Sequence, residues 1–304
     1  MTTNTAPTAA LHAENLVKSF RDSGGGRVTA VDGLSLSVQP GEVVAFLGPN
    51  GAGKTTTIDM IAGFTRPDSG RVEVYGREPR AAAASGSMAL IAQTGGLLPD
   101  FTVEESVQIV ASLHGCPERT GPVLQRAGIA DLAGRRVSRC SGGEQQRLKF
   151  AIATLSDPDL IILDEPTAGM DVESRRSFWH AMRADADAGR TVLFATHYLE
   201  EADAFADRIV MIAGGRIVAD GPTAQIRTLA GARVVSAIVD DDGLTAVCAA
   251  LPGTRVLERR GGRSYLMADD SDALARTLLT ATAAREVEIA APDLEDAFVA
   301  LTSV

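Results

Sequence analysis

The sequence predicts an α/β fold in which a largely parallel β-sheet is flanked by helices. The first observation is a set of short apolar runs, each of the length of one buried strand. The second is that helical stretches separate these runs, and strands that alternate with helices form parallel sheets. The third is a glycine-rich loop between the first run and a helix. The runs are Val43–Leu47, Leu160–Leu163, Val192–Ala195 and Ile209–Ile212.

The composition fits a globular chain with one large and one small domain. The 304 residues are 45% hydrophobic, which is enough apolar material for a sizeable core. The net charge of −10 argues against a nucleic-acid-binding protein, because such proteins present a basic face. We therefore expect no nucleic-acid partner.

Cysteine usage and hydropathy indicate the compartment. The three cysteines, Cys116, Cys140 and Cys248, lie far apart and form no CxxC pair, which fits a reducing compartment. No apolar run approaches the roughly 18 residues that a membrane helix needs, and the N-terminus has no signal-peptide pattern. We expect a cytoplasmic protein that does not itself cross a membrane.

The N-terminal part of the chain begins with strands. Residues 15–47 combine a nearly alternating apolar pattern with turn-forming Gly and Pro residues, which is typical of short strands. After the glycine-rich loop we expect a helix over Thr55–Ala62, with Gly63 as its C-cap. A strand over Val72–Tyr75 follows.

The segment 102–155 predicts helices. Thr102 followed by Glu105 forms a capping box. The apolar residues after it share one helical face, which should pack against the protein. These residues are Val103, Val107, Val110 and Leu113.

A second unit is predicted after the turn at 220–222. The chain restarts there with strand-type runs over Val234–Val239, Val256–Glu258, Tyr265–Ala268 and Val287–Ile289. Helices are expected from Ser271 to Ala283 and from Pro292 onward. The acidic run Asp240–Asp242 before Gly243 is interpreted most simply as a turn, with a metal site as the alternative.

The glycine-rich loop carries a phosphate-binding pattern. Its sequence, Gly48-Pro49-Asn50-Gly51-Ala52-Gly53-Lys54-Thr55, fits GxxxxGK[ST]. Glycine permits the backbone angles that turn successive N–H groups inward, and the next helix directs its positive end at the phosphates. Lys54 is expected to reach the β- and γ-phosphates and Thr55 to bind Mg²⁺. The expected nucleotide contacts run from Gly48 to Thr56.

Two carboxylates follow the apolar run Leu160–Leu163. Asp164 suits the role of holding Mg²⁺, directly or through water, and Glu165 suits that of general base on an attacking water. The alternative is that the pair caps the next helix. The phosphate loop upstream favours the first interpretation, and by itself that loop indicates a nucleoside triphosphatase or a kinase.

A third motif narrows the class. Cys140-Ser141-Gly142-Gly143-Glu144-Gln145-Gln146-Arg147 resembles the signature motif of ABC ATPases and precedes the acidic pair, as in that family. Cys140 stands in place of the usual Leu, and Glu144 in place of a frequent Gln. Four further positions over a match of about 11–222 resemble family motifs: Phe20, which stacks on adenine, Gln93 of the Q-loop, Asp171 of the D-loop and the switch histidine, His197.

Within that family the sequence resembles the ATP-binding subunits of drug and antibiotic exporters of the daunorubicin-resistance type. The segments Thr167–Asp171 and Ala195–Asp203 carry this resemblance. The ending Pro292–Phe298 is similar to the LEDAF-like C-terminal helix of that branch.

The resemblance implies a P-loop NTPase core with an antiparallel β element at its N-terminus. It implies a nucleotide-binding domain over 11–222, with a helical signature subdomain at about 94–155, and a small α+β accessory domain over 232–304. It further implies a subunit that binds ATP and Mg²⁺, forms a homodimer with a second nucleotide-binding subunit, and drives a separate transmembrane permease. Such a subunit lies at the inner face of the cell membrane and contacts it only through the permease.

The implied site residues have three roles. Catalysis would fall to Glu165, His197, Lys54 and Gln93. The Mg²⁺ ion would be organised by Thr55, Gln93 and Asp164. The nucleotide would be held by Phe20, by Gly48 to Thr56 and, across the subunit interface, by Ser141, Gly142, Gly143 and Asp171.

Several alternatives stay open. The residues Leu97, Leu98 and Phe101 either seat the permease or pack the helical subdomain. An importer ATPase, or an ABC ATPase without a transport role, would share the motifs; the latter usually has two ATPase domains or a coiled coil, and the stretch from Lys54 to Ser141 leaves no room for one. A P-loop kinase or GTPase would lack the signature motif. The transported molecule is not identified, because its pocket lies in another polypeptide.

Overall fold

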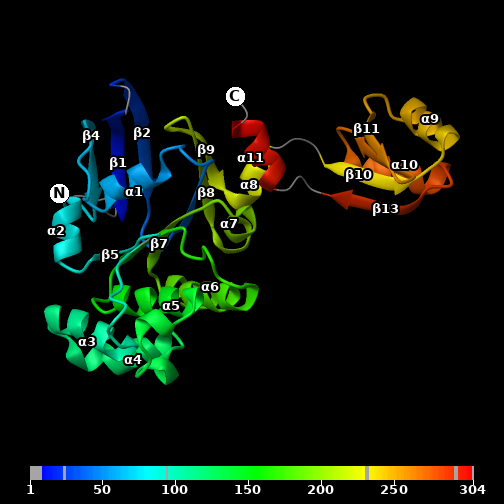
Figure 1. The fold of residues 1–304 in the computed structure, drawn as a ribbon. Coiled ribbons are helices and arrows are strands. Elements are labelled where there is room, and N and C mark those ends of the chain that lie inside the picture. Colours follow the sequence, from blue (N-terminus) through cyan, green and yellow to red (C-terminus); the bar gives the residue numbers. More distant parts are fainter. Residues whose placement is uncertain (1–8, 23–24, 94, 230–232, 291–293, 303–304) are drawn as a thin grey trace, which may run out of the picture. The chain divides into compact units, whose positions relative to one another are not determined.

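The contacts of the chain divide it into two units, Met1–Gly221 and Pro222–Val304. The computed structural model describes residues 9–22, 25–93, 95–229, 233–290 and 294–302. Figure 1 shows the elements of both units. Each unit has a hydrophobic core of its own.

The first unit contains a six-stranded sheet with the order β5-β6-β7-β3-β8-β9. The paired strands from β5 to β8 run parallel. The strands β3, β6 and β7 are buried along their whole length, as expected for continuous apolar runs in a parallel sheet. The predicted α/β core is confirmed. The strands are β3 (Val43–Leu47), β5 (Met88–Ile91), β6 (Leu160–Asp164), β7 (Thr191–Thr196), β8 (Arg208–Ala213) and β9 (Arg216–Pro222).

An antiparallel sheet lies beside it and confirms the predicted N-terminal β element. Its strands are β1 (Leu11–Arg21), β2 (Arg27–Val38) and β4 (Ser69–Val74), in the order β2-β1-β4. The strand β4 begins earlier than the predicted Val72, because Arg71 and Ser69 pair with β1. Cross-strand pairing, which the local pattern does not encode, therefore sets this boundary.

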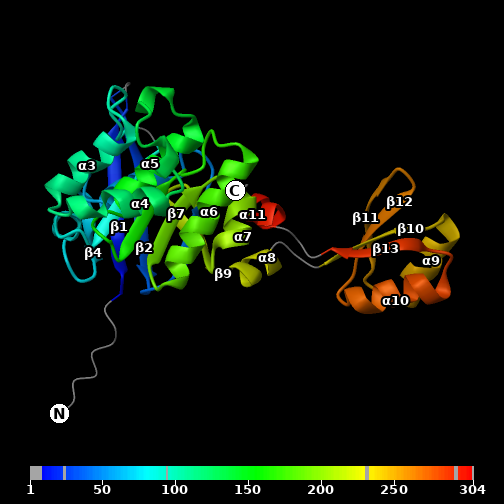
Figure 2. The same cartoon turned by 90° about the horizontal axis from the view of Figure 1, so that it is seen from below.

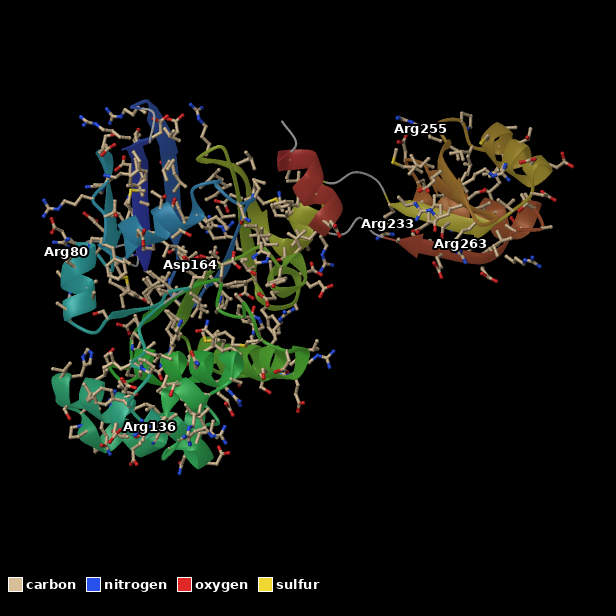
Figure 3. All side chains as sticks on the ribbon, in the orientation of Figure 1. Arg80, Arg136, Asp164, Arg233, Arg255 and Arg263 are labelled. Atoms are coloured by element: carbon tan, nitrogen blue, oxygen red, sulfur yellow. The ribbon has the colours of Figure 1, made fainter. Side chains whose placement is uncertain are left out.

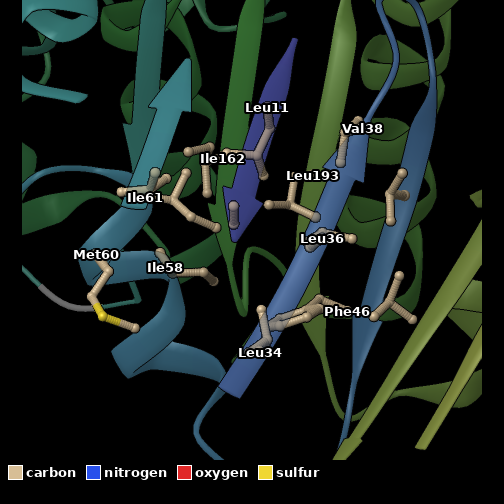
Figure 4. Close-up of a cluster of buried hydrophobic side chains, with 14 of the residues drawn as sticks. Leu11, Leu34, Leu36, Val38, Phe46, Ile58, Met60, Ile61, Ile162 and Leu193 are labelled. Atoms are coloured by element: carbon tan, nitrogen blue, oxygen red, sulfur yellow. The ribbon is translucent and has the colours of Figure 1, made fainter. Parts of the chain in front are cut away.

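One core joins the two sheets to helix α1 (Lys54–Ile61), as Figure 4 shows. Burial of a Leu or Phe side chain contributes about 1.5–3 kcal/mol. The core thus fixes β3 and α1, and with them both ends of the loop between them. Its members include Leu11, Leu34 and Leu36 of the antiparallel sheet, Phe46, Ile162 and Leu193 of the parallel sheet, and Ile58, Met60 and Ile61 of α1.

The helices α3, α4 and α5 lie together in both views, between β5 and β6 in the chain (Figures 1 and 2). Short 3₁₀ turns at Pro117–Arg119, Ala130–Leu132 and Val137–Arg139 connect them. The helices of this unit are α1, α2 (Pro79–Ala84), α3 (Val103–Leu113), α4 (Thr120–Arg126), α5 (Gly142–Ala153), α6 (Val172–Asp187) and α7 (Leu199–Phe205).

The start of α3 confirms the predicted capping box. The prediction that Leu113 belongs to the packed face of this helix is wrong. The Thr102 hydroxyl accepts a hydrogen bond from the Glu105 N–H at 3.2 Å, and the Glu105 carboxylate accepts one from the Thr102 N–H at 2.8 Å. Leu113 is 82% exposed. It is the last residue of α3 and lies off the stripe set by the i, i+4 spacing of the buried residues Val103, Val107 and Ala111.

The second unit contains a four-stranded antiparallel sheet with the order β11-β12-β10-β13. Strands and helices follow the β-α-β-β-α-β order of ferredoxin-like units, and the predicted small α+β unit has this form. The helices α8 and α11 lie side by side in Figures 1 and 2. The elements are α8 (Thr223–Thr228), β10 (Val234–Ile238), α9 (Asp241–Ala250), β11 (Arg255–Arg260), β12 (Arg263–Met267), α10 (Ser271–Ala281), β13 (Arg285–Ala290) and α11 (Leu294–Thr302).

Two predictions for this unit are not confirmed. The turn predicted at Asp240–Asp242 is wrong: Asp240 is the N-cap of α9, and its side chain accepts a hydrogen bond from the Gly243 N–H at 2.8 Å. The predicted start of the last helix, Pro292, lies outside the described residues, and α11 is described from Leu294.

Over the described ranges, none of the helices combines the length and the apolar character that a bilayer crossing requires.

Candidate active site

The loop after β3 approaches neighbouring backbone so closely that two of its glycines are required. A Cβ on Gly48 would lie 2.5 Å from the Ile212 carbonyl oxygen, and one on Gly53 would lie 2.3 Å from the Ala30 carbonyl oxygen. Gly53 also has a φ of +102°, which side chains other than glycine rarely adopt. The loop therefore keeps a fixed path from the end of β3 into α1.

Lys54, the first residue of α1, is buried and points back at this loop. Its ammonium group donates to the carbonyl oxygens of Gly48 at 2.6 Å and Pro49 at 3.3 Å. Burial lowers the pKa of Lys54, and the nearby carboxylates of Glu165 and Asp164 act in the opposite direction. The loop carbonyls thus hold a cation where an anionic ligand could replace them.

Asp164 ends β6 in the interior of the first unit, as Figure 3 shows. Burial raises the pKa of this carboxyl, while a hydrogen bond from the Thr55 side chain lowers it. Its Oδ1 atom has no hydrogen-bond partner among the described residues. A buried carboxylate oxygen without a partner, beside a hydroxyl, suits a hard cation such as Mg²⁺.

Glu165 comes next, at the turn that leaves β6. Its φ of +50° is unusual for a residue with a side chain, and its N–H donates to the Ala195 carbonyl oxygen at 2.9 Å. Its Oε2 atom lies 2.7 Å from Nδ1 of His197, which follows β7. An imidazole nitrogen that carries a hydrogen donates it to a carboxylate oxygen, so this contact can orient the Glu165 side chain.

A cavity of about 370 Å³ gathers the predicted residues from distant parts of the chain. Phe20 comes from β1, where the residue is 46% exposed, and Gln93 comes from the loop after β5. Glu165 and His197 line it from the ends of β6 and β7. The whole lining is Phe20, Ala30, Pro49, Asn50, Gly51, Ala52, Gly53, Lys54, Thr55, Thr56, Gln93, Glu165 and His197.

Five predicted nucleotide contacts are not among the lining residues. One is Gly48, whose carbonyl oxygen accepts a hydrogen bond from the lining residue Lys54. The other four lie further along the chain. Ser141, Gly142 and Gly143 begin α5, and Asp171 caps α6. The Asp171 carboxylate accepts hydrogen bonds from the Ser174 N–H at 2.8 Å and hydroxyl at 2.7 Å, which lower its pKa. Within one chain these four residues are separate from the cavity.

The signature segment contains a second capping box. The Glu144 carboxylate accepts a hydrogen bond from the Ser141 N–H at 2.7 Å, and the Ser141 hydroxyl accepts one from the Glu144 N–H at 3.3 Å. Arg135 also donates to Glu144, at 2.9 Å. The pattern S-x-x-E at 141–144 is a sequence signature of such a box, and comparison with the family motif hides it, because there Glu144 counts as a departure.

Another contact could not be found from local sequence. The Lys149 ammonium group, on α5, donates to the Ala92 carbonyl oxygen at 3.3 Å, next to Gln93. Burial lowers the pKa of Lys149. It ties the helical segment to the loop that brings Gln93 to the cavity.

Comparison with known proteins identifies the family of the chain. A family described as ABC transporter matches residues 31–168. The chain is 35% identical to the Nod factor export ATP-binding protein I of Burkholderia lata, over 97% of this chain and 98% of the relative. It is 34% identical to the daunorubicin/doxorubicin resistance ATP-binding protein DrrA of Streptomyces peucetius, over 98% and 94% of the two chains.

Solved structures with the same fold are ATP-binding cassettes. One is a nucleotide-free cassette from an ABC transporter, with a TM-score of 0.62 and 28% identity, over 70% of this chain and 91% of that one. Another is a dimeric cassette in a post-hydrolysis state with ADP and phosphate, with a TM-score of 0.64 and 23% identity, over 70% and 98%. The second likeness shows the fold alone.

Proposed function

Because this chain belongs to the ABC transporter family and is an ATPase subunit of that family, we propose that it powers export through a separate membrane-spanning permease. The observation that carries this proposal is the cavity at the phosphate loop, which Lys54, Glu165 and His197 also line. Near-full-length similarity to a Nod factor export ATP-binding protein and to a daunorubicin/doxorubicin resistance ATP-binding protein supports export as the direction of transport. It also disfavours an importer.

The proposed chemistry is attack of water on the γ-phosphate of ATP, with ADP as the leaving group. Glu165 takes the proton of the water while the oxygen–phosphorus bond forms. His197 holds Glu165 through the 2.7 Å contact and reaches toward the γ-phosphate. Lys54 exchanges its loop carbonyls for phosphate oxygens, which neutralises charge that develops during transfer.

The residues that would hold Mg²⁺ are Thr55, Asp164 and Gln93. Two observations support this assignment. The Oδ1 atom of Asp164 has no hydrogen-bond partner among the described residues, and the Thr55 side chain makes a hydrogen bond to the same carboxyl group. A bound Mg²⁺ would supply Lewis-acid stabilisation of the phosphate oxygens. Phe20, with its exposed ring, would stack on adenine.

We propose that a second copy of the chain completes the site. Ser141 and Gly142 are exposed at the start of α5, where the positive end of the helix dipole favours an anion. They are absent from the lining of their own cavity. Ser141, Gly142 and Gly143 would therefore close over ATP held by the other subunit, and Asp171 would cross the interface.

The permease would dock on the segment after Gln93, of which Thr94 lies outside the described residues. Leu98 is 54% exposed and Phe101 37% exposed. The backbone of this segment is fixed, because the Phe101 carbonyl oxygen accepts a hydrogen bond from the Val137 N–H at 2.9 Å. A fixed backbone with outward apolar side chains favours docking over internal packing. Docking on the permease would place the protein at the inner face of the cell membrane.

We further propose that the two parts of the chain have different roles. Residues 11–222 would bind and hydrolyse ATP, with the helical subdomain at about 94–155, and residues 232–304 would form an accessory domain. The exported molecule would be a drug, an antibiotic or another lipophilic compound, in line with the name of one relative.

The experiment that tests this function is copurification with a candidate permease, a membrane protein chosen from the neighbouring reading frames. The complex should hydrolyse ATP faster when lipophilic candidate substrates are added, and a Leu98→Asp variant should no longer copurify. A chain that hydrolyses ATP but binds no membrane protein would contradict the transport role and leave the ATPase activity intact.

A further inference from the structure

A buried carboxylate that the mechanism above does not use lies in the first turn of α7. The Glu201 side chain is 3% exposed. Its Oε2 atom accepts a hydrogen bond from the Thr196 hydroxyl at 3.0 Å, and its Oε1 atom accepts a short one from the Thr167 hydroxyl. Oε1 also lies 3.4 Å from Nε of Arg175. Glu201 thus joins three segments that are separate in the sequence.

The groups around the Glu201 carboxyl can all donate to it. They are two threonine hydroxyls and a guanidinium, and carboxylate oxygens accept hydrogen bonds. Burial of a carboxylate is costly unless such partners compensate for the lost water. The Arg175 guanidinium is itself held, because it lies over the Tyr198 ring at 4.6 Å. Each partner therefore has a defined position relative to Glu201.

Two of these partners adjoin residues with proposed roles in ATP hydrolysis. Thr196 directly precedes His197, and Thr167 lies between Glu165 and Asp171 in the chain. The Thr196 hydroxyl also accepts the Tyr198 N–H at 3.0 Å, which fixes the backbone on the far side of His197. A shift at His197 would reach the Thr167–Asp171 segment through Glu201.

We propose that Glu201 is a positioning residue that holds His197 and the Thr167–Asp171 segment in one arrangement. Contact of His197 with the γ-phosphate and contact of Asp171 with the second subunit would then be gained or lost together. The inference rests on the proposed roles of His197 and Asp171. Glu201 itself touches neither nucleotide nor water in this scheme.

Glu201→Gln is the direct test, with Glu200→Gln as its matched control. Glutamine keeps the shape but turns an NH₂ group toward a donor, so the cluster loses one contact. We expect kcat to fall at least tenfold, with the dissociation constant of ATP within twofold of the wild type. Glu200 lies on the same turn and is exposed, so its variant should keep both values. A wild-type kcat in Glu201→Gln would overturn the inference.

A double-mutant cycle separates positioning from general stabilisation. If Glu201 acts through His197, Glu201→Gln should lower the single-turnover rate less than twofold in a His197→Ala background. Losses that multiply would overturn the inference. A His197→Ala variant with the wild-type rate would instead remove the proposed role of His197, and the inference with it.

A second variant covers the case in which Glu201→Gln does not fold. Thr167→Val removes only the hydroxyl from a fully buried, nearly isosteric side chain, and it should lower kcat with little change in ATP affinity. Thr167→Ser restores the hydroxyl and should recover most of the rate. If the valine and serine variants are equally active, the Glu201 cluster does not position the site.

Discussion

At the scale of single residues, the site depends on side chains held in unusual positions. Glu165 has a left-handed backbone and a 2.7 Å contact with His197. Such conformations cost on the order of 1–3 kcal/mol and persist where the surroundings impose them. Here the hydrogen bond from the Glu165 N–H to Ala195 imposes it.

Glu165→Gln should abolish hydrolysis but not binding. The amide cannot take a proton from water, and a general base contributes about 10²–10⁴ in rate. We expect kcat to fall by about that factor while ATP binding, measured by equilibrium titration, stays within twofold. Glu104→Gln, at an exposed position of α3, is the control. An unchanged kcat in Glu165→Gln would show that another group activates the water.

The two glycines of the phosphate loop should differ in their tolerance of a methyl group. Gly53→Ala places Cβ against the Ala30 carbonyl oxygen, whereas a Cβ on Gly51 meets nothing within 4 Å. Both have a positive φ, which costs alanine about 1 kcal/mol. We expect Gly51→Ala to lose about that much free energy of unfolding in urea titrations, and Gly53→Ala to lose at least about 2 kcal/mol more. Equal losses would contradict the close approach.

At the scale of secondary structure, helix caps connect stability with the site. The box between Ser141 and Glu144 orders the start of α5, the segment proposed to meet ATP of the second subunit. Hydrogen bonds from Ser141 lower the pKa of Glu144, with Arg135 contributing.

Glu144→Gln should therefore remove a pH-dependent contribution to stability. Because the folded-state pKa is below the ordinary 4.5, the stabilisation is present above about pH 4.5 and disappears as the pH falls through the lower, folded value. We expect the wild type to exceed the variant by about 0.3–1 kcal/mol at pH 7 and to match it at the acid end. A difference that is independent of pH would show that the charge of Glu144 contributes nothing.

Helix α9 begins in an acidic run for which the sequence predicted a turn. An acidic run before a glycine resembles a turn, but Asp240 caps the helix and the following acidic residues lie in its first turn, where the helix dipole favours negative charge. Asp240→Ala should destabilise the second unit by about 1 kcal/mol in urea titrations. Asp242→Ala, which leaves the cap in place, is the control, and equal losses would contradict capping by Asp240.

At the scale of the whole molecule, two residues proposed to contact ATP are absent from the cavity of their own chain. The lining of that cavity does not include Ser141 or Asp171. We therefore propose that activity requires two copies, each of which supplies these residues to the ATP of the other.

ATP should drive dimer formation when hydrolysis is blocked. In sedimentation experiments we expect Glu165→Gln to double in mass on addition of ATP and Mg²⁺. Adding Ser141→Arg should prevent this, because the exposed start of α5 would no longer fit against the phosphate. Ser112→Arg, on an exposed position of α3, should still dimerise. A monomer that hydrolyses ATP at the full rate would exclude the two-copy site.

The sequence by itself determined what depends on neighbours in the chain. It predicted the buried strands from their apolar runs, the capping box at Thr102, and the loop between β3 and α1. The type of each of these elements could be predicted, because hydrophobic periodicity, helix capping and glycine conformation are local properties of the sequence.

Only the tertiary structure decided how these pieces meet. Neighbouring strands such as β3 and β7 are far apart in the chain, and their order brings Phe20, Gln93 and His197 to one cavity. It also decided that Leu113 faces solvent and that Glu201 is buried among donors. Burial and pairing are set by long-range packing of many side chains, and no local pattern contains that information.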